Sequence, residues 1–387
     1  MIDSLITTLF NGVSIGTVLL IVALGLAIVF GLMGVINLAH GELMMLGAYT
    51  TYVVQNGFGM LGDGLQDWYI WAAIPMSFVV AALVGLALER GVIRFLYGRP
   101  LETLLATWGV SLILQQFVRS VSWSMVIGLL VFCVLFFGGQ WVLSRFARIA
   151  EHRQALVNTG LFLLSGAIAF LLGGNLNNNA TLSRPWFSAR NVDVTAPGWL
   201  QGSISVTDSI QFPASRLFII ALTVVCLLGV YLFLQKSAWG LRIRSVTQNR
   251  NMSACLGIPT AQVDAVTFAL GSGLAGVAGF AVTLLGSVGP NLGVNYIVDA
   301  FMVVVVGGVG NLLGSVIAAL GIGIVTYLLG SGTIPLALGS GDGVVVSFFD
   351  FFATTSMAKV MVFALIIVFL QVRPAGLFPP KGRSAEV

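Results

Sequence analysis

Residues 5–30 read LITTLFNGVSIGTVLLIVALGLAIVF, a stretch without a single charged side chain. An α-helix of roughly 20 apolar residues crosses the hydrocarbon core of a bilayer, so this stretch is long enough to span a membrane. Further charge-free runs of similar length are Tyr69–Leu88, Ser122–Leu143, Ala155–Gly174 and Leu217–Leu234. Together they predict an all-α polytopic membrane protein, a bundle of about ten or more transmembrane helices.

The composition of the chain supports this class. Of the 387 residues, 58% are hydrophobic and 8% charged, and the mean hydropathy is +1.01. Soluble domains carry about 25% charged residues, so a bilayer is the solvent that suits this chain. The first apolar run is longer than a signal-peptide core and has no Lys or Arg before it, so we expect a retained helix.

Loop charges predict the orientation. The basic segments, expected in the cytoplasm, are Arg90–Arg99, Arg145–Arg153 and Lys236–Arg250. The segments with acids but no Lys or Arg, expected outside, are Gln55–Asp67, Gly286–Asp299 and Gly330–Asp350. Counting the spans between these segments then places the N-terminus outside. Because the basic residues fit short cytoplasmic loops, we expect no nucleic-acid partner.

The apolar stretch Ala300–Leu329 lies between two segments that we expect outside, so it must cross twice or re-enter. Four glycines between positions 307 and 314 surround Asn311 and predict a broken, glycine-rich helix pair. Irregular backbone at membrane depth survives where it is buried in protein or lines a wet cavity. A final span over Ala358–Leu370 returns the chain to the cytoplasm, with Lys359 expected to snorkel at its outer end.

Polar residues interrupt the run GLMGVINLAHGELMMLGAY, residues 31–49, at Asn37, His40 and Glu42. Polar and ionisable groups inside a membrane are costly and commonly functional. We therefore name five candidates for the translocation pathway or its gate: Asn37, His40, Glu42, Asp299 and Asn311. Interhelical hydrogen bonding in a packed bundle is an equally open interpretation of the first three. For Asp264 and Asp299, a place at a helix start, where the helix dipole favours an acid, is the simpler interpretation.

The segment 236–259 reads KSAWGLRIRSVTQNRNMSACLGIP, which is basic and contains no acid. It can form an amphipathic helix over Ala238–Leu256, ended by Gly257 before Pro259. Its exposed face either docks a cytoplasmic partner or lies on anionic lipid, and the pattern leaves both open.

Catalytic chemistry is not indicated. The chain has two histidines and three widely spaced cysteines, and it lacks a phosphate-binding glycine loop with its lysine. We expect no catalytic residue, no metal site, no disulfide and no enzyme activity. Energy for transport then comes from another subunit or from a gradient. The latter would make the chain a secondary transporter or channel that uses His40, Glu42 or Asp299 as ion sites.

These motifs resemble the permease subunits of the branched-chain amino acid and urea class of ABC importers. The strings that carry the resemblance lie within residues 10–119 and 188–378: NLAHGELMMLGAYTTYVVQ, YGRPLETLLATWGVSLILQQ, QNRNMSACLGIP, GPNLGVNYIVDAFMVVVVGGVGNLLG and RPAGLF. GELMM and RPLETLLATWG are more similar to the B-type urea permeases. The resemblance implies a single permease domain over residues 1–387 in the bacterial inner membrane, with urea as the solute. Branched-chain amino acids or short amides are the alternative.

The resemblance also implies partners. They are a second homologous permease, two cytoplasmic ATPases that bind ATP and Mg, and a periplasmic or extracellular solute-binding protein, so this chain itself binds no cofactor. Segment 236–259 is similar to the coupling segment that docks in a groove of the ATPase. The implied coupling residues are Arg242, Arg244, Asn249, Arg250 and Gly257.

Residues 121–184 depart from the family pattern. They read as an inserted hairpin of two extra spans around Arg145–Arg153. Because the hairpin can be skipped without changing the topology of either flank, we expect it at the periphery of the bundle.

Overall fold

The computed structural model describes residues 2–62, 66–146, 151–177, 183, 186–187, 191–207, 210–333, 351 and 353–378. The chain forms two compact units, Met1–Leu112 with Val192–Val387, and Ile113–Asn191. Among the described residues, eight helices are long and apolar enough to cross a membrane, and two shorter apolar helices accompany them. The prediction of an all-α polytopic membrane protein is confirmed.

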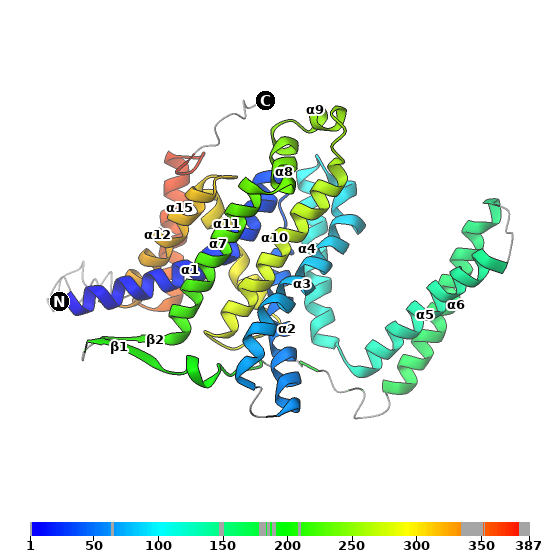
Figure 1. Ribbon diagram of the computed structural model, residues 1–387, viewed down its shortest axis with the longest axis horizontal. Coiled ribbons are helices and arrows are strands. Elements are labelled where there is room, and N and C mark those ends of the chain that lie inside the picture. Colours follow the sequence, from blue (N-terminus) through cyan, green and yellow to red (C-terminus); the bar gives the residue numbers. More distant parts are fainter. Residues whose placement is uncertain are drawn as a thin grey trace. The chain divides into compact units, whose positions relative to one another are not determined.

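The first unit is a helix bundle with one small sheet (Figure 1). Its elements in chain order are α1 (Ile2–Met33), α2 (His40–Leu61), η1 (Gln66–Trp68), α3 (Tyr69–Gly91), η2 (Ile93–Leu96), α4 (Pro100–Ser120, whose end belongs to the second unit), η3 (Gly198–Leu200), β1 (Ser203–Thr207), β2 (Ile210–Pro213), α7 (Ala214–Lys236), α8 (Ala238–Gln248), α9 (Arg250–Cys255), α10 (Thr260–Thr283), α11 (Leu292–Gly307), α12 (Leu312–Gly330) and α15 (Thr355–Val372).

The centre of the bundle is α10, which packs against α1, α2 and α3. Every residue of α10 from Gly271 to Thr283 is buried. Its glycines allow backbones to touch: a Cβ added at Gly276 would meet the carbonyl oxygen of Ser77 in α3, and one at Gly279 would meet that of Met44 in α2. Small residues at such contacts are how membrane helices approach closely without relying on a hydrophobic driving force.

The predicted break between Ala300 and Leu329 is present. Helix α11 ends at Gly307, and α12 begins at Leu312 after Gly308 and Gly310, whose φ angles of 99° and 84° lie in the region that glycine adopts freely. The tip of this hairpin contacts the segment that follows α15, since Leu377 N–H donates to the carbonyl of Val306 over 2.8 Å. The hairpin therefore reaches the end of the unit at which α15 stops.

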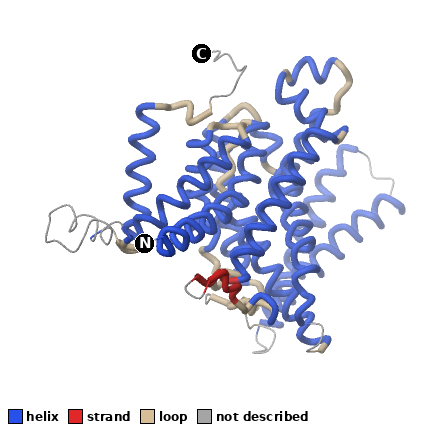
Figure 2. The backbone as a smooth tube through the Cα atoms, turned by 60° about the vertical axis from the view of Figure 1, so that its left-hand side comes forward, coloured by secondary structure: helices blue, strands red, loops and turns tan. Residues whose placement is uncertain are grey.

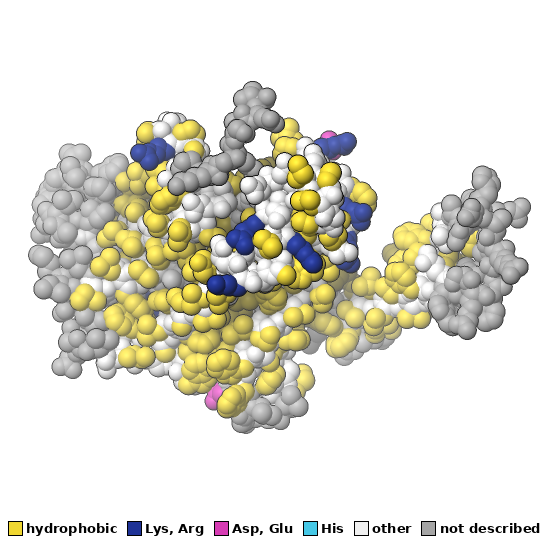
Figure 3. Space-filling view, turned by 45° about the horizontal axis from the view of Figure 1, so that its top comes forward, with side chains coloured by type: hydrophobic (Ala, Val, Ile, Leu, Met, Phe, Trp, Pro, Cys, Tyr) yellow, Lys and Arg dark blue, Asp and Glu magenta, His cyan; other side chains and the backbone are white. Residues whose placement is uncertain are grey.

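Basic side chains gather at that same end, where α8 and α9 lie (Figures 1 and 3). The exposed Lys and Arg residues there are Arg90, Arg94, Arg99, Lys236, Arg242, Arg244, Arg250 and Arg373. Within the described part of this unit, Arg216 and Lys359 lie elsewhere. We call this the basic end. The positive-inside rule expects it in the cytoplasm.

The opposite end carries the sheet and its loops (Figure 2). Strands β1 and β2 pair antiparallel, and Val192 forms a bridge with Val288. The segment that contains Val192 and Thr195, which we call the covering segment, is held by side chains of α2 and α3. Gln55 Nε2 and the Tyr69 hydroxyl donate to the carbonyl of Thr195 at 2.7 and 3.0 Å. The segment therefore covers the end of the bundle that we expect to face outward.

The second unit contains α5 (Trp123–Phe146) and α6 (Glu151–Asn177). The two helices pack against each other, with the Phe162 ring 5.5 Å from that of Phe132 and 5.8 Å from that of Phe136. Both are long and apolar enough to span a membrane, and few of their residues are buried within the unit. The assignment of residues 121–184 as an insertion stays a prediction.

Candidate functional site

The basic segment after α7 is organised by two helix caps. The Ser237 side chain accepts from Gly240 N–H at 2.9 Å and starts α8, and the Asn249 side chain accepts from Met252 N–H at 2.9 Å and starts α9. Ser and Asn are favoured at this position because their oxygens satisfy a free N–H of the first turn. The prediction of one helix over 238–256 is therefore wrong: the extended backbone of Asn249 divides it. Gly257, with φ of 81°, ends the segment as predicted.

Helix α8 has an apolar face and a basic face. Ile243 and Val246 are buried in a cluster with residues of α1, α7 and α10. Arg242 and Arg244 are exposed on the other side. The Arg242 guanidinium lies 4.9 Å from the centre of the Trp239 ring, a distance at which the ring face attracts a cation.

Exposed apolar side chains accompany these arginines. Leu241 of α8 is 60% exposed, Met252 of α9 is 58% exposed and Leu256 is 75% exposed. A surface that mixes cations with large apolar side chains suits a protein groove or a lipid headgroup region, so both interpretations of the segment stand.

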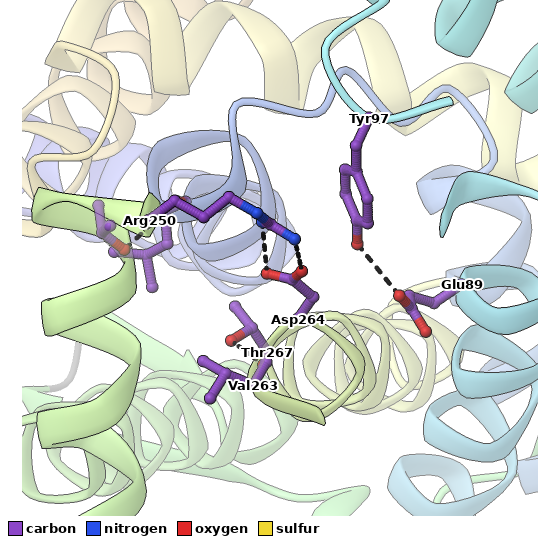
Figure 4. Close-up of polar contacts among 8 residues, drawn as sticks. Glu89, Tyr97, Arg250, Val263, Asp264 and Thr267 are labelled. Atoms are coloured by element: carbon purple, nitrogen blue, oxygen red, sulfur yellow. Dashed lines mark hydrogen bonds and ion pairs between the residues drawn. The ribbon is translucent and has the colours of Figure 1, made fainter. Parts of the chain in front are cut away.

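The Arg250 side chain, although 47% exposed, reaches inward to α10 (Figure 4). Its guanidinium makes two hydrogen bonds with the buried Asp264 carboxylate of α10, Nη1 to Oδ1 at 3.2 Å and Nη2 to Oδ2 at 2.5 Å. Paired N–H groups of arginine match the two oxygens of a carboxylate, which fixes orientation as well as distance. The basic segment is thereby tied to α10, the helix at the centre of the bundle.

Two further residues extend this contact to α3. The Arg250 guanidinium lies 5.2 Å from the centre of the Tyr97 ring, and the Tyr97 hydroxyl donates to Glu89 Oε1 at 3.2 Å. Burial, together with the carboxylates of Asp264 and Glu89, raises the pKa of Tyr97, so the hydroxyl keeps its proton and acts as the donor. We call Arg250, Asp264, Tyr97 and Glu89 the anchor cluster. Sequence reasoning named Arg250 but missed the other three as site residues.

Asn37, in the α1–α2 connection, and His40 and Glu42, in the first turn of α2, lie inside the bundle. His40 Nε2 lies 3.1 Å from the carbonyl oxygen of Val22 in α1. Glu42 Oε1 accepts from the Ser111 hydroxyl of α4 at 3.2 Å. Asn37, His40 and Glu42 are all at most 1% exposed. The contacts of His40 and Glu42 support the interpretation as interhelical hydrogen bonding, whereas the Asn37 side chain accepts locally from Ala39 N–H at 3.0 Å.

Asp299 lies in the middle of α11, as its eighth residue, so its interpretation as a residue at a helix start is wrong. Lys359 Nζ of α15 lies 3.0 Å from Asp299 Oδ2, so this lysine is paired. The pair borders a cavity of about 160 Å³. Asn311 lies apart from it and caps α12, accepting from Gly314 N–H at 3.2 Å.

Comparisons with known proteins give a consistent result. Residues 8–370 match the family described as "Branched-chain amino acid transport system / permease component". The chain is 26% identical over 371 residues to the high-affinity branched-chain amino acid transport system permease protein LivH of Escherichia coli K12, covering 95% of this chain and 94% of LivH. It is 25% identical over 318 residues to BraD of Pseudomonas aeruginosa, a permease protein of the same description, covering 82% and 83%. No solved structure matches the chain.

Proposed function

The chain belongs to the branched-chain amino acid transport system permease family. From that premise we propose that it carries a small polar solute, with transport coupled to ATP hydrolysis by the partner ATPases through α8 and α9. As a member, it is a multi-pass membrane permease component of a bacterial ABC transporter, and it is not an enzyme and needs no cofactor. Permeases of this family function with a partner permease, ATPases and a solute-binding protein. Membership sets aside the secondary transporter and channel alternatives.

The anchor cluster is the observation that carries the coupling proposal. A docking segment is useful only if its displacement moves the bundle. The bidentate contact of Arg250 with Asp264 joins α9 to α10, and α10 packs on three other helices. Arg242 and Arg244 lie on the exposed side, so they are available to a partner. We assign docking on the ATPases to these two, and transmission to Arg250.

Substitution of Arg242 and Arg244, which we call the docking arginines, and substitution of Arg250 in the anchor cluster should have different effects. Arg242→Glu with Arg244→Glu should abolish co-purification of the ATPases, because two cations of the docking face become anions, while membrane insertion is unchanged. Arg250→Gln should keep co-purification and lose transport. Arg250→Lys should restore part of it, because one donor of the pair remains. Arg373→Glu, at the same end but outside the segment, is the control. Unchanged co-purification of the double variant refutes the docking assignment.

For the solute we propose urea. The strings GELMM and RPLETLLATWG, which resemble the urea branch, support it. Branched-chain amino acids are the second candidate, because the family and the similar proteins LivH and BraD are named for their transport. Uptake of labelled urea and of labelled leucine at limiting concentration, in cells with and without this chain, separates the two. Loss of leucine uptake alone overturns the choice of urea.

For the pathway we retain Asn37, His40, Glu42, Asp299 and Asn311 as proposed contributors. Glu42 and Asp299 are the acids among them, and both are buried within helices. Buried acids in a membrane bundle are rarely maintained without a function, which supports the proposal.

A further inference from the structure

A cavity of about 160 Å³ lies among α1, α11, α12 and α15. Val18 and Phe363 are among the apolar residues of its wall, and Thr326 adds a hydroxyl. Its charged part is the ion pair of Asp299 and Lys359. Liquid water occupies about 30 Å³ per molecule, so the volume corresponds to roughly five waters and suits a small solute.

The cavity lies toward the end of the bundle opposite the basic end. Helix α11 starts just after Val288, which pairs with Val192 of the covering segment. Asp299 is the eighth residue of α11 and Lys359 the fifth of α15, about 10 and 6 Å from the helix starts at 1.5 Å per residue. A solute that arrives from outside would therefore meet this pair early in its path.

The pair is costly if its role is structural. Removing two charges from water is repaid only by good geometry, and apolar residues of similar size are often as stabilising. The Lys359 side chain is also 43% exposed, against 10% for Asp299, and a half-exposed ammonium beside lipid tails is unfavourable. Lys359 lies about one turn from the start of α15, so its ammonium can reach the water interface, and both charges border the cavity.

We propose that this cavity binds the transported solute, with Asp299 accepting hydrogen bonds from its N–H groups and Lys359 donating to its oxygen. The inference rests on the proposed function and deepens it by naming the site. Urea carries N–H groups beside its carbonyl oxygen, so from the cavity side it can hydrogen-bond to both members of the 3.0 Å ion pair. An α-amino acid presents an ammonium and a carboxylate in the same way, with its side chain against the apolar wall. Both solutes share N–H donors and an oxygen acceptor.

The site is tested in the assembled transporter by measuring whether a bound solute protects an introduced cysteine from a thiol reagent. Thr326→Cys places a thiol in the cavity wall, in a chain whose native Cys133, Cys226 and Cys255 are replaced by alanine. Val325→Cys is the matched control, because Val325 is the preceding residue of α12, is 37% exposed and does not line the cavity. Both variants are reacted with a water-soluble maleimide, with and without urea or leucine.

We expect urea to slow labelling at Thr326→Cys and not at Val325→Cys, with loss of this protection on Asp299→Asn or Lys359→Met. Protection by leucine in place of urea also supports the site and identifies the zwitterion as its ligand. The site is overturned if neither solute slows labelling, or if the reagent reaches only the control.

ATPase association and hydrolysis stimulated by the loaded binding protein are measured on the same preparations. Intact hydrolysis without protection overturns the site alone. Failure of the parent chain to associate with the ATPases overturns the proposed function instead.

Discussion

At the scale of single residues, the proposed coupling contact and the proposed solute site each depend on a pair that is distant in sequence. Arg250 and Asp264 are 14 positions apart, and Asp299 and Lys359 are 60 apart. Each charge stands out beside an apolar run, and Arg250 and Asp299 are predicted site residues. Their partners could not be predicted, because one pairing depends on the helix break at Asn249 and the other on how α15 approaches α11.

The interior polar residues show the same limit. The sequence indicates that Asn37, His40 and Glu42 lie in an apolar environment, and they are buried. Their partners are a carbonyl of α1 for His40 and a hydroxyl of α4 for Glu42. Periodicity within one helix says nothing about which neighbour it faces, so these contacts required the structure.

Gly279 gives a residue-scale prediction about the bundle. An added Cβ would meet the Met44 carbonyl of α2, so we expect Gly279→Ala to push α2 and α10 apart and cost about 1–3 kcal/mol. Thermal unfolding of the purified chain in detergent measures this as a lower Tm. Gly229→Ala in α7, where the added Cβ has no neighbour within 4 Å, should keep or raise the Tm. Equal melting of the two variants would show that this close approach is not needed.

At the scale of helices, the sequence was most informative where the signal is local. Charge-free runs predicted α1, α3 and α7, because spanning a bilayer requires length and apolarity within one segment. Glycines predicted the break between α11 and α12, because their effect on helix stability is also local. The division of α8 from α9 was missed. Basic and apolar residues continue across Asn249 at helical spacing, and one capping residue was enough to end the pattern.

Asn249 therefore gives a prediction at this scale. Its side chain caps α9, and loss of an Asn cap costs about 1 kcal/mol. We expect Asn249→Ala to loosen α9, weaken the hold of Arg250 on Asp264 and reduce transport per ATP hydrolysed, with ATPase binding preserved. Asn249→Asp retains a capping oxygen and should behave as the parent chain. Hydrogen exchange of the α9 amides, measured with uptake, provides the check: unchanged exchange in the alanine variant would contradict the capping role.

At the scale of the whole molecule, the two ends of the first unit differ in charge. Basic side chains lie at the end with α8 and α9, and the sheet and covering segment lie at the other. Loop charge and parity predicted this arrangement. Family membership was indicated by several short motifs and is shown by a match over residues 8–370. The identity of the solute stays a prediction, because we propose that it depends on a few side chains around one cavity.

The second unit supplies a whole-molecule prediction. If residues 121–184 are a peripheral insertion, a chain in which Ser120 is joined to Pro185 through a short Gly-Ser linker should assemble with its partners and transport at the parental rate. Membrane assembly by size-exclusion chromatography and uptake of labelled solute are compared in the same cells. Normal assembly with abolished transport would count strongly against a peripheral role.

The central claim is that the helices form a polar passage that an ATP-hydrolysing partner drives through the basic end. The most direct test is solute entry into proteoliposomes that hold this chain and its partner permease, with or without the ATPases, ATP and loaded binding protein. The account predicts accumulation of labelled urea only when all components are present, and none when Arg250 is replaced by Gln. Accumulation by the purified chain alone, without any nucleotide-hydrolysing subunit, would contradict it.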